Sequence, residues 1–218
     1  MTFTTGPTTA VVVGNPKPAS RTVGQLAGAR PAITALLSHP PRSDCKTLTG
    51  LTTNQDLDPA RLREAFGSFP SGVVAVAAEV DGELVGLAAS SFTSVSLDPP
   101  LVSVSVANTS RTWPDLRRAD RLGLTVLAER HGEVCQQLAG PVARRFDDVP
   151  VTVMESGAVT LDEGLARFGC SVYREVEAGD HTIILLLLHA VEHAAAPADG
   201  VLGAPLVFHR SAFGRMAV

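Results

Sequence analysis

The sequence predicts a mainly β domain, folded as an antiparallel Greek-key barrel with a few flanking helices. At least seven segments show the alternating or β-branched patterns of strands, whereas helical patterns are few. Short turns join most of these segments, and Asp81-Gly82 is a strong two-residue hairpin signal. Such turns favour an antiparallel barrel over a doubly wound sheet, because parallel strands need long crossover connections.

Composition limits the kind of protein this can be. The chain has 218 residues, 45% apolar and 18% charged, which suits one core and at most two domains. The net charge of −4 argues against a nucleic-acid partner, and so does the lack of a Lys/Arg cluster beyond short pairs. We interpret these pairs, Arg117-Arg118 and Arg144-Arg145, as solvated faces. We expect no membrane association, since the longest apolar run, Ile183 to Leu188, is far shorter than the ~20 residues of a membrane span.

The start of the chain and its cysteines indicate the compartment. Residues 1–10 are Thr-rich and lack the charged start and apolar run of a secretory signal. Cys45, Cys135 and Cys170 are odd in number and form no CxxC, which suits free thiols in a reducing environment. We therefore expect a cytoplasmic protein, with Cys170 as a buried and inert thiol.

Residues 1–57 do not follow the barrel pattern. AVVVGNPKPASRT, from Ala10, predicts a strand, a turn and the start of a helix, and residues 38–55 are a Pro/Ser/Thr-rich linker. The segment resembles the first strand and phosphate loop of flavodoxin-like NADPH-dependent FMN reductases, with Ser20, Arg21 and Thr22 at the phosphate-binding positions. The further strands of that fold do not follow. We therefore expect a partly disordered arm, a remnant without a second active site, before a domain at 58–218.

A helix is predicted directly after Asp58. Asp58 is a favourable N-cap, Pro59 is favoured at the first helical position, and Pro70 ends the helix. Four apolar residues share one helical face, so we expect this face to cover the barrel: Leu62, Ala65, Phe66 and Phe69.

The strands that follow differ in pattern. Residues 101–107 and 165–176 alternate between apolar and polar positions, which predicts strands with one buried face. Thr182 to Val191 is nearly continuously apolar, so this strand is expected to be buried on both faces. The remaining expected elements are strands at 73–80, 83–89, 122–127 and 205–209 and a helix at 129–139.

The stretch from Gly86 to Leu101, GLAASSFTSVSLDPPL, has the composition of a ligand site. Small side chains let a flat ligand approach the backbone, and its five hydroxyls can bind carbonyl or phosphate oxygens. The pair Pro99-Pro100 is expected to stop local strand pairing. An ordinary Ser-rich loop between two strands is an equally good interpretation of this composition.

A second candidate site is Asn108 to Leu116, NTSRTWPDL. Thr112 and Asp115 have the spacing of a capping box, which predicts a short helix starting there. Hydroxyls, free N–H groups and the Arg111 cation at a helix start could bind a phosphate, although most such signals are ordinary caps. Trp113 is either a packing anchor or a ligand contact.

Two motifs contain histidines that could act in a functional site. His189, Glu192 and His193 match the H-x-x-E-H zinc pattern, but on a strand the two histidines lie about 13 Å apart and cannot share a metal. We therefore expect no metal site. Gly179-Asp180-His181 forms a turn into the apolar strand, where a lone histidine is usually structural or solvated.

Five segments in order resemble the flavin reductase family with the FMN-binding split barrel, which supplies reduced flavin to partner monooxygenases. They span about 150 residues: FGSFPSGVVAVAA from Phe66, AASSFTSVSLDPPL from Ala88, NTSRTWPDL from Asn108, GDHTI from Gly179 and PLVFHR from Pro205. The resemblance implies a split β-barrel, a homodimer, FMN or FAD as cofactor, NADH or NADPH as co-substrate and a monooxygenase partner. The choice within each cofactor pair stays open.

The resemblance also implies roles for particular residues. His181 would place the nicotinamide as the catalytic residue, with Phe146 framing the same face. Many family members carry a polar residue where this chain has Leu185 to Leu188, which weakens the nicotinamide assignment relative to the flavin assignment. The implied cofactor-binding residues are Ala88, Ala89, Ser90, Ser91, Ser94, Val95, Ser96, Leu97, Ser110, Arg111, Thr112, Phe146, Gly179, Asp180, His209 and Arg210.

Three functional hypotheses follow. The first is an NAD(P)H:flavin oxidoreductase, in which the cofactors carry the chemistry and the protein aligns them. The second is a flavin-binding accessory module on the same fold with little reductase activity. The third, a haem-handling barrel, is disfavoured because the Gly86 to Leu101 stretch contains no histidine.

Overall fold

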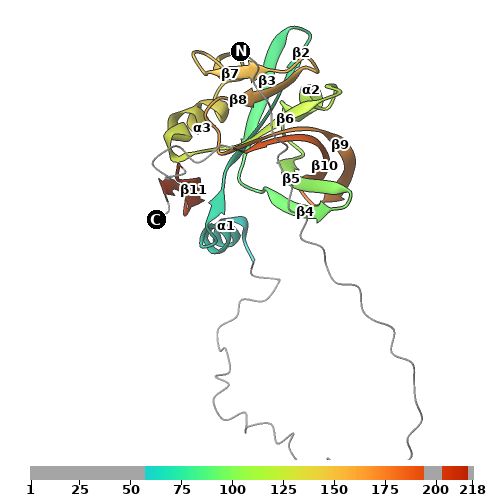
Figure 1. The fold of residues 1–218 in the computed structure, drawn as a ribbon. Coiled ribbons are helices and arrows are strands. Elements are labelled where there is room, and N and C mark those ends of the chain that lie inside the picture. The colour runs from blue at the N-terminus through green and yellow to red at the C-terminus, as the bar shows by residue number, and fades with distance from the viewer. Residues whose placement is uncertain (1–56, 194–202, 216–218) are drawn as a thin grey trace, which may run out of the picture. The chain divides into compact units, whose positions relative to one another are not determined.

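The computed structural model describes residues 57–193 and 203–215, and these form a mainly β fold (Figure 1). The predicted arm, including Ser20 to Thr22 and Cys45, lies outside the described residues. The helices are α1 (Pro59–Gly67), α2 (Trp113–Leu116) and α3 (Gly132–Leu138), with 3₁₀ turns η2 (Glu129–His131) and η3 (Val142–Arg144). No helix among the described residues is long and apolar enough to cross a membrane.

Twelve strands in the described residues form two antiparallel sheets. The larger sheet has the order β4-β5-β10-β9-β6-β2-β8-β7, with β3 paired to β2, and the smaller one has the order β1-β11-β12. Because β5 lies beside β10 and β9 beside β6, the chain makes Greek-key connections rather than a simple meander. The predicted fold class is therefore confirmed. The strands are β1 (Ser71–Gly72), β2 (Val74–Val80), β3 (Glu83–Ala89), β4 (Thr93–Leu97), β5 (Pro100–Ala107), β6 (Leu122–Val126), β7 (Val151–Val153), β8 (Ala158–Leu161), β9 (Ala166–Ala178), β10 (His181–His193), β11 (Leu206–His209) and β12 (Ala212–Arg215).

Two hairpins follow the predicted turn chemistry. Asp81 and Gly82 have φ values of 55° and 83° and connect Val80 directly to its partner Glu83. Positive φ at both central residues matches the right-handed twist of the strands that they join. The longer hairpin, β9–β10, turns at Gly179 with φ 69°, and places His181 at the first position of β10.

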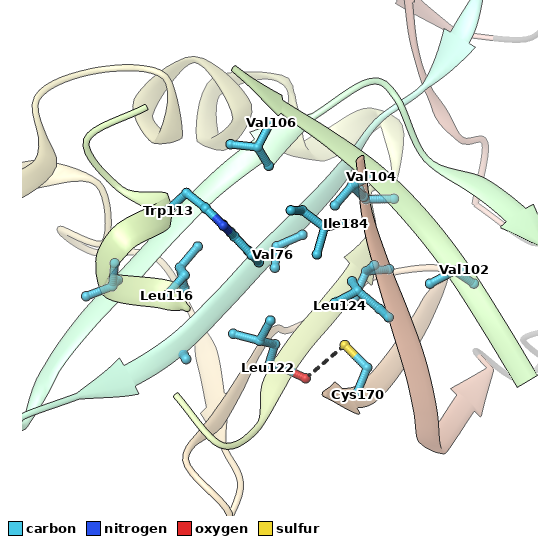
Figure 2. Close-up of a cluster of buried hydrophobic side chains, with 14 residues drawn as sticks. Val76, Val102, Val104, Val106, Trp113, Leu116, Leu122, Leu124, Cys170 and Ile184 are labelled. Atoms are coloured by element: carbon cyan, nitrogen blue, oxygen red, sulfur yellow. Dashed lines mark hydrogen bonds between the residues drawn. The ribbon is translucent and has the colours of Figure 1, made fainter. Parts of the chain in front are cut away.

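Strand β2 packs against a hydrophobic core on each of its faces. Val74, Val76 and Ala78 belong to one cluster, whereas Val73, just before the strand, and Ala75 belong to another. Figure 2 shows the first cluster, where Trp113 from α2 packs among strand side chains. Trp113 is therefore a packing anchor. The other large members of the first cluster are Val85, Val102, Val104, Val106, Leu116, Leu122, Leu124, Ile184 and Leu186, and the second contains Leu127, Cys135, Leu138, Leu161 and Leu206.

The two cysteines in the described part of the chain are buried free thiols. The Cys170 thiol donates a 3.3 Å hydrogen bond to the Leu122 carbonyl, drawn as a dashed line in Figure 2, and burial raises its pKa to about 12. Burial also raises the pKa of the Cys135 thiol, to about 11. Both cysteines are free, and the expected burial of Cys170 is confirmed.

One close approach between strands requires glycine. A Cβ atom at Gly123 on β6 would overlap the backbone carbonyl of Val159 on β8. Both strands pair with β2, at Val76 and Ala77 respectively, so they converge on neighbouring positions of the same strand. A residue with a side chain would therefore force the two backbones apart.

Helix α1 begins as predicted but does not cover the barrel. The Asp58 carboxylate accepts hydrogen bonds from the N–H groups of Ala60 at 2.8 Å and Arg61 at 3.0 Å. No residue of α1 is fully buried, and Phe66 and Phe69 are 70% and 77% exposed. The prediction for the apolar face was wrong because helical periodicity identifies such a face without showing what packs on it.

Two further predictions were wrong, one on the pairing at Pro99-Pro100 and one on the burial of β10. Leu97 pairs with Pro100, so Asp98 and Pro99 form the turn of a β4–β5 hairpin and Pro100 begins β5 instead of stopping the pairing. Strand β10 is fully buried only at Ile184 and Leu186. Its pairing with β5 ends at Leu187, and beyond this point only β9 lies beside it, which leaves Val191 68% exposed.

The H-x-x-E-H residues lie on this exposed end of β10. His189 is hydrogen-bonded to the Ser171 hydroxyl at 2.8 Å, and Glu192 forms an ion pair with Arg167 at 2.6 Å. The strand prediction for this motif is confirmed, so it lacks the helical spacing that the zinc pattern needs. Among the described residues, no three His, Cys, Asp or Glu side chains gather in a group that could hold a metal ion.

Candidate functional site

The main cavity lies where the ends of β3 and β5 meet the loop before α2 and the segment after α3. Its volume of about 680 Å³ is in the range of small-molecule sites. We call it the main cavity; it is lined by Leu87, Ala88, Ala89, Ser90, Ser91, Ser105, Val106, Ala107, Thr109, Ser110, Arg111, Thr112, Leu138, Ala139, Gly140, Pro141, Val142, Arg145 and His181.

Eight of the predicted site residues meet in this cavity, from three separate segments. They are Ala88, Ala89, Ser90, Ser91, Ser110, Arg111, Thr112 and His181. Ala88 and Ala89 close β3, the three residues from Ser110 precede α2, and His181 begins β10. Because β5 connects to the loop at Asn108 and pairs with β10 through Ala107 and His181, the sheet itself brings the last two segments together.

The loop before α2 is capped differently from the prediction. The Ser110 hydroxyl accepts hydrogen bonds from the N–H groups of Thr112 at 3.3 Å and Trp113 at 3.2 Å. The Thr112 side chain makes no capping bond, so the predicted capping box with Asp115 was wrong. Ser110 satisfies the donors at the helix start, and the Thr112 hydroxyl is available for a different partner.

Arg145 binds the Thr112 hydroxyl and connects three segments around the main cavity. Its Nη1 donates to the Thr112 hydroxyl at 2.6 Å and to the Gly86 carbonyl at 2.8 Å, and its Nε donates to the Gly140 carbonyl at 3.0 Å. No described carboxylate forms an ion pair with it, and partial burial lowers the pKa of its guanidinium, which remains a cation. A charged group held by neutral oxygens at a cavity wall adds positive potential to that wall.

The role of Arg145 was not predicted, because the Arg144-Arg145 pair was expected to be exposed to solvent. That interpretation holds only for Arg144, whose side chain is 80% exposed and pairs with Asp147. The sequence signal that could have separated them is the neighbouring Phe146, an aromatic residue that packs inward. A Cβ atom at Gly86 would overlap the Phe146 ring, so the ring lies against β3, behind the wall rather than in the cavity.

Asn108 attaches the loop before α2 to the turn that carries His181. Its backbone N–H donates to the Asp180 carbonyl at 3.0 Å, and its side-chain N–H donates to the Gly179 carbonyl at 3.1 Å. Its side-chain oxygen accepts from the Thr182 hydroxyl at 2.9 Å. Three bonds from one residue, two to backbone carbonyls and one to a side chain, therefore hold the segment from Gly179 to Thr182. This role was also missed, since nothing near Asn108 in sequence indicates it.

Asp180 orients the His181 ring. The ring Nδ1 lies 2.7 Å from a carboxylate oxygen of Asp180, so Nδ1–H donates and Nε2 is left for other contacts. This hydrogen bond and the charge of the His181 ring lower the pKa of Asp180, and Arg63 makes a smaller contribution in the same direction. Gly179 and Asp180 themselves do not line the cavity, and act on it through His181.

One predicted hydroxyl is used by the fold. The Ser91 Oγ donates to the Ser105 carbonyl at 3.1 Å and accepts from the Ser105 N–H at 2.8 Å. A neighbouring strand would make the same two bonds to the Ser105 backbone. The Ser91 side chain therefore takes the place of a strand beside β5, just after β3 has ended. Ser90, one residue earlier, is exposed and forms no such bond.

The remaining predicted residues lie elsewhere. Ser94, Val95, Ser96 and Leu97 form β4 and line none of the cavities described here, because this segment pairs with β5 as a hairpin. His209 ends β11 and is exposed, and Arg210 follows it in the β11–β12 turn, at a different cavity.

Two further cavities adjoin the main one. A small apolar cavity of about 230 Å³ shares Ala88, Ala89, Ser90 and Ala139 with it and adds Val73, Cys135, Gln136, Phe208 and Phe213. A larger one of about 840 Å³, which we call the arginine cavity, shares Ser90 and Ser91 and lies against α1. Ser90 is common to all three.

The residues present fit a flat aromatic ligand that carries a phosphate. The alanine side chains at the end of β3 let such a ring approach the backbone, and the apolar cavity extends this wall. At the polar end, the Arg111 side chain is exposed and has no hydrogen-bond or ion-pair partner in the described part of the chain. Arg111 and Arg145 both place positive charge at this end, which favours the binding of a phosphate.

Comparison with known proteins supports the same family. The flavin reductase like domain model matches residues 66–217. The chain is 40% identical over 143 residues to a probable flavin reductase from Rhizobium meliloti (strain 1021), covering 65% of this chain and 46% of the relative. It is also 40% identical over 129 residues to the stachydrine N-demethylase reductase subunit Stc3 of that organism, covering 59% and 56%. The chain thus spans about half the length of these two relatives.

A solved structure agrees with these matches. The Streptomyces globisporus C-1027 NADH:FAD oxidoreductase SgcE6, in complex with NAD and FAD fragments, is 31% identical to this chain. Its TM-score is 0.68, over 78% of this chain and 98% of that one. Because the domain model covers more than half of the chain and the fold agrees with it, the chain belongs to the flavin reductase like domain family.

Proposed function

We propose that this protein is an NAD(P)H-dependent flavin reductase that transfers hydride to FMN or FAD and supplies the reduced flavin to a partner monooxygenase. The observation that carries the proposal is the main cavity, where an alanine-lined wall, two arginines and an oriented histidine converge. The family match and the reductase names of the relatives support it.

The flavin would be held by residues with distinct tasks. The backbone at Ala88 and Ala89 would lie against its ring, and the apolar cavity beyond them suits the ring's methylated end. Arg111 would bind the phosphate, while Ser110 and Arg145 hold the loop in place. The flavin and the nicotinamide supply the hydride chemistry, so the protein needs to align them and exclude water.

His181 would position the nicotinamide. Asn108 fixes its backbone and Asp180 fixes its ring, so Nε2 can act as a hydrogen-bond partner of defined direction. Leu185 to Leu188 pair with neighbouring strands and do not line the main cavity. The apolar character of that segment therefore does not weaken the assignment of His181.

The test is steady-state oxidation of NADH and NADPH by purified protein, each with FMN and with FAD, followed by nicotinamide absorbance. Oxidation that requires added flavin supports the reductase and identifies both cofactors. Flavin binding without oxidation would indicate the accessory module instead. The variant His181→Ala should oxidise NAD(P)H more slowly while binding flavin normally, and normal turnover in this variant would contradict the role of His181.

We also propose that the protein forms a homodimer through the β4 end of the large sheet. β4 is the terminal strand in the sheet order, and Leu97 on it is 97% exposed. Val95, Tyr173 and Val191 are further exposed apolar residues on β4, β9 and β10. Light scattering should give twice the mass of the chain, and Leu97→Glu should shift it toward the monomer. A monomeric wild type would exclude the dimer.

A further inference from the structure

Arg145 lies in the segment that joins α3 to β7. Residues 138–142 of this region line the main cavity, and Arg145 follows directly after the 3₁₀ turn η3. From there its guanidinium reaches Gly86 on β3 and Thr112 before α2. The guanidinium can hold those two segments in place only if the Arg145 backbone is itself fixed. The contacts that fix this backbone therefore matter for the main cavity.

Backbone hydrogen bonds do not attach the Arg145 turn to another described element. The Arg145 N–H donates to the Val142 carbonyl at 3.3 Å, which closes the turn on itself. The Phe146 ring attaches the turn on one side, where it packs so closely on β3 that a Cβ atom at Gly86 would overlap it. A contact with α3 supplies the attachment on the other side.

The side chain of Gln137 makes this contact. Its Nε2 donates to the Arg144 carbonyl at 2.9 Å and to the Asp147 carbonyl at 2.7 Å. Because both acceptors are carbonyl oxygens, the orientation of the amide is determined and both of its N–H groups are used. The two carbonyls lie on either side of Arg145 in sequence, so the amide holds the backbone around Arg145.

The backbone of Gln137 leads to the Arg145 guanidinium as well. The Gln137 carbonyl accepts the Gly140 N–H at 2.9 Å, and the Gly140 carbonyl accepts the Arg145 Nε–H at 3.0 Å. A Cβ atom at Gly140 would lie 3.1 Å from the Gln137 carbonyl oxygen, so the chain returns closely past the end of α3. Gln137 is thus connected to both ends of the Arg145 residue.

Helix α3 gives Gln137 a firm base. Cys135 and Leu138 of the same helix are 5% and 1% exposed and belong to the second hydrophobic cluster. Gln137 itself does not line the main cavity, whereas Arg145 does. Any effect of Gln137 on a ligand in this cavity must therefore be transmitted through its neighbours.

We propose that Gln137 is a positioning residue of the flavin site, which sets the place of Arg145 and, through it, the separation of the segments at Gly86 and Thr112. This inference rests on the proposed binding of flavin in the main cavity. The position requires an amide donor, because an apolar side chain makes neither bond and a carboxylate cannot donate.

Hydrogen exchange of the flavin-free protein tests the positioning by itself. Gln137→Met keeps a helix-forming side chain of similar length, so it should fold, and it removes both side-chain bonds. Exchange should become about tenfold faster at residues 142–147. It should also become faster at the N–H groups of Thr112 and Trp113, which Gln137 does not contact and which depend on the loop that Arg145 holds.

The control for this experiment lies on the same helix. Glu133→Met changes an exposed residue one turn earlier in α3 and should exchange like the wild type at both segments. Faster exchange confined to residues 142–147 in Gln137→Met would show that the effect does not pass through Arg145. That result, or exchange equal to that of Glu133→Met, would overturn the inference.

A double-mutant cycle with Arg145→Lys tests the consequence for flavin. Gln137→Met alone should weaken FMN binding about tenfold, measured by fluorescence quenching, as expected for the neutral hydrogen bonds that it loses. In the Arg145→Lys background the same change should weaken binding no further, because the contacts that Gln137 supports are already lost. Equal losses in both backgrounds, or wild-type affinity in Gln137→Met, would contradict the inference.

Turnover separates positioning from a general loss of structure. In Gln137→Met the KM for flavin should rise, while kcat at saturating flavin and the KM for NAD(P)H stay at wild-type values, because Gln137 has no contact with the His181 turn. A fall in kcat with an unchanged KM for flavin would reject the role. A wild type that bound no flavin would reject the proposed function instead, and the exchange experiment would still decide whether Gln137 positions Arg145.

Discussion

The side-chain oxygen of Asn108 accepts a 2.9 Å hydrogen bond from the hydroxyl of Thr182, across 74 residues of sequence. Asn108 also binds the backbone at Gly179 and Asp180, so the loop that leads to Arg111 and the turn that carries His181 form one unit. The proposed phosphate-binding and nicotinamide-positioning groups are therefore held at a fixed separation by a residue that does not line the cavity.

Asn108→Ala should loosen this unit. The variant loses two side-chain hydrogen bonds, so we expect a loss of about 1–3 kcal/mol in the free energy of unfolding, measured by urea denaturation. The KM for NAD(P)H should rise more than the Kd for flavin, because the histidine turn moves while the β3 wall stays. Thr182→Val removes only one of the bonds and should show a smaller effect; an equal effect would contradict this interpretation.

Arg145→Lys should weaken flavin binding by at least tenfold. A single ammonium group cannot reproduce the three bonds that Arg145 makes to Gly86, Thr112 and Gly140, so the walls separate. Quenching of FMN fluorescence measures the affinity. The matched control is Arg144→Lys at the exposed neighbouring position, which should bind FMN as the wild type does. Equal affinities for both variants would show that Arg145 does not organise the cavity.

Gly123→Ala should destabilise the barrel. The added methyl group overlaps the Val159 carbonyl, and relieving it requires movement of β6 or β8, at a cost of about 1–3 kcal/mol or more. Urea denaturation measures this cost. Gly72→Ala is the control, because a Cβ atom there has no neighbour within 4 Å. Similar stabilities for the two variants would mean that the strands are less closely packed than described.

The stability of the fold should fall below about pH 6.5 because of His131. The Ala128 N–H donates to its Nδ1 at 3.0 Å, and its Nε2 donates to the Asp162 carbonyl at 3.0 Å, so the folded protein binds the neutral ring. Burial is the main cause that lowers the His131 pKa from 6.5, and the Arg130 charge adds to it; the hydrogen bond to the Asp162 carbonyl and the charge of Glu163 oppose it.

Protonation of His131 should destabilise the folded protein. Because the folded pKa is lower than the unfolded one, stability is fully present above pH 6.5 and is lost as the pH falls through the folded pKa. The free energy of unfolding in urea should therefore decrease from neutral to mildly acid pH. His131→Gln should show a weaker dependence on pH over this range, and an unchanged dependence would assign the effect to other groups.

Features with local signals were predictable from the sequence. The Asp58 cap and the Asp81-Gly82 turn depend on contacts within three residues, and both are confirmed. The Ala88 to Ser91 stretch, Ser110 to Thr112 and His181 also stood out by local composition, and the structure brings them to one cavity.

Features that depend on distant partners were not predictable. Arg145 binds residues 33 and 59 positions away, and Asn108 binds residues 71 and 74 positions away, so the sequence around each residue does not show its partners. The capping prediction at Thr112 failed because the Ser110 hydroxyl accepts the Thr112 N–H, which the Asp115 carboxylate would have bound, and Arg145 binds the Thr112 hydroxyl. The α1 prediction failed because its apolar residues line a cavity rather than the barrel core.

Ser90 lines all three cavities, and this constrains how the protein can change. A larger side chain at this position would narrow every cavity at once, so an engineered variant cannot gain selectivity for one ligand here without affecting the others. The same geometry offers a starting point for inhibitor design. A fragment anchored beside Ser90 can be extended in three directions, and each extension would report on a different cavity.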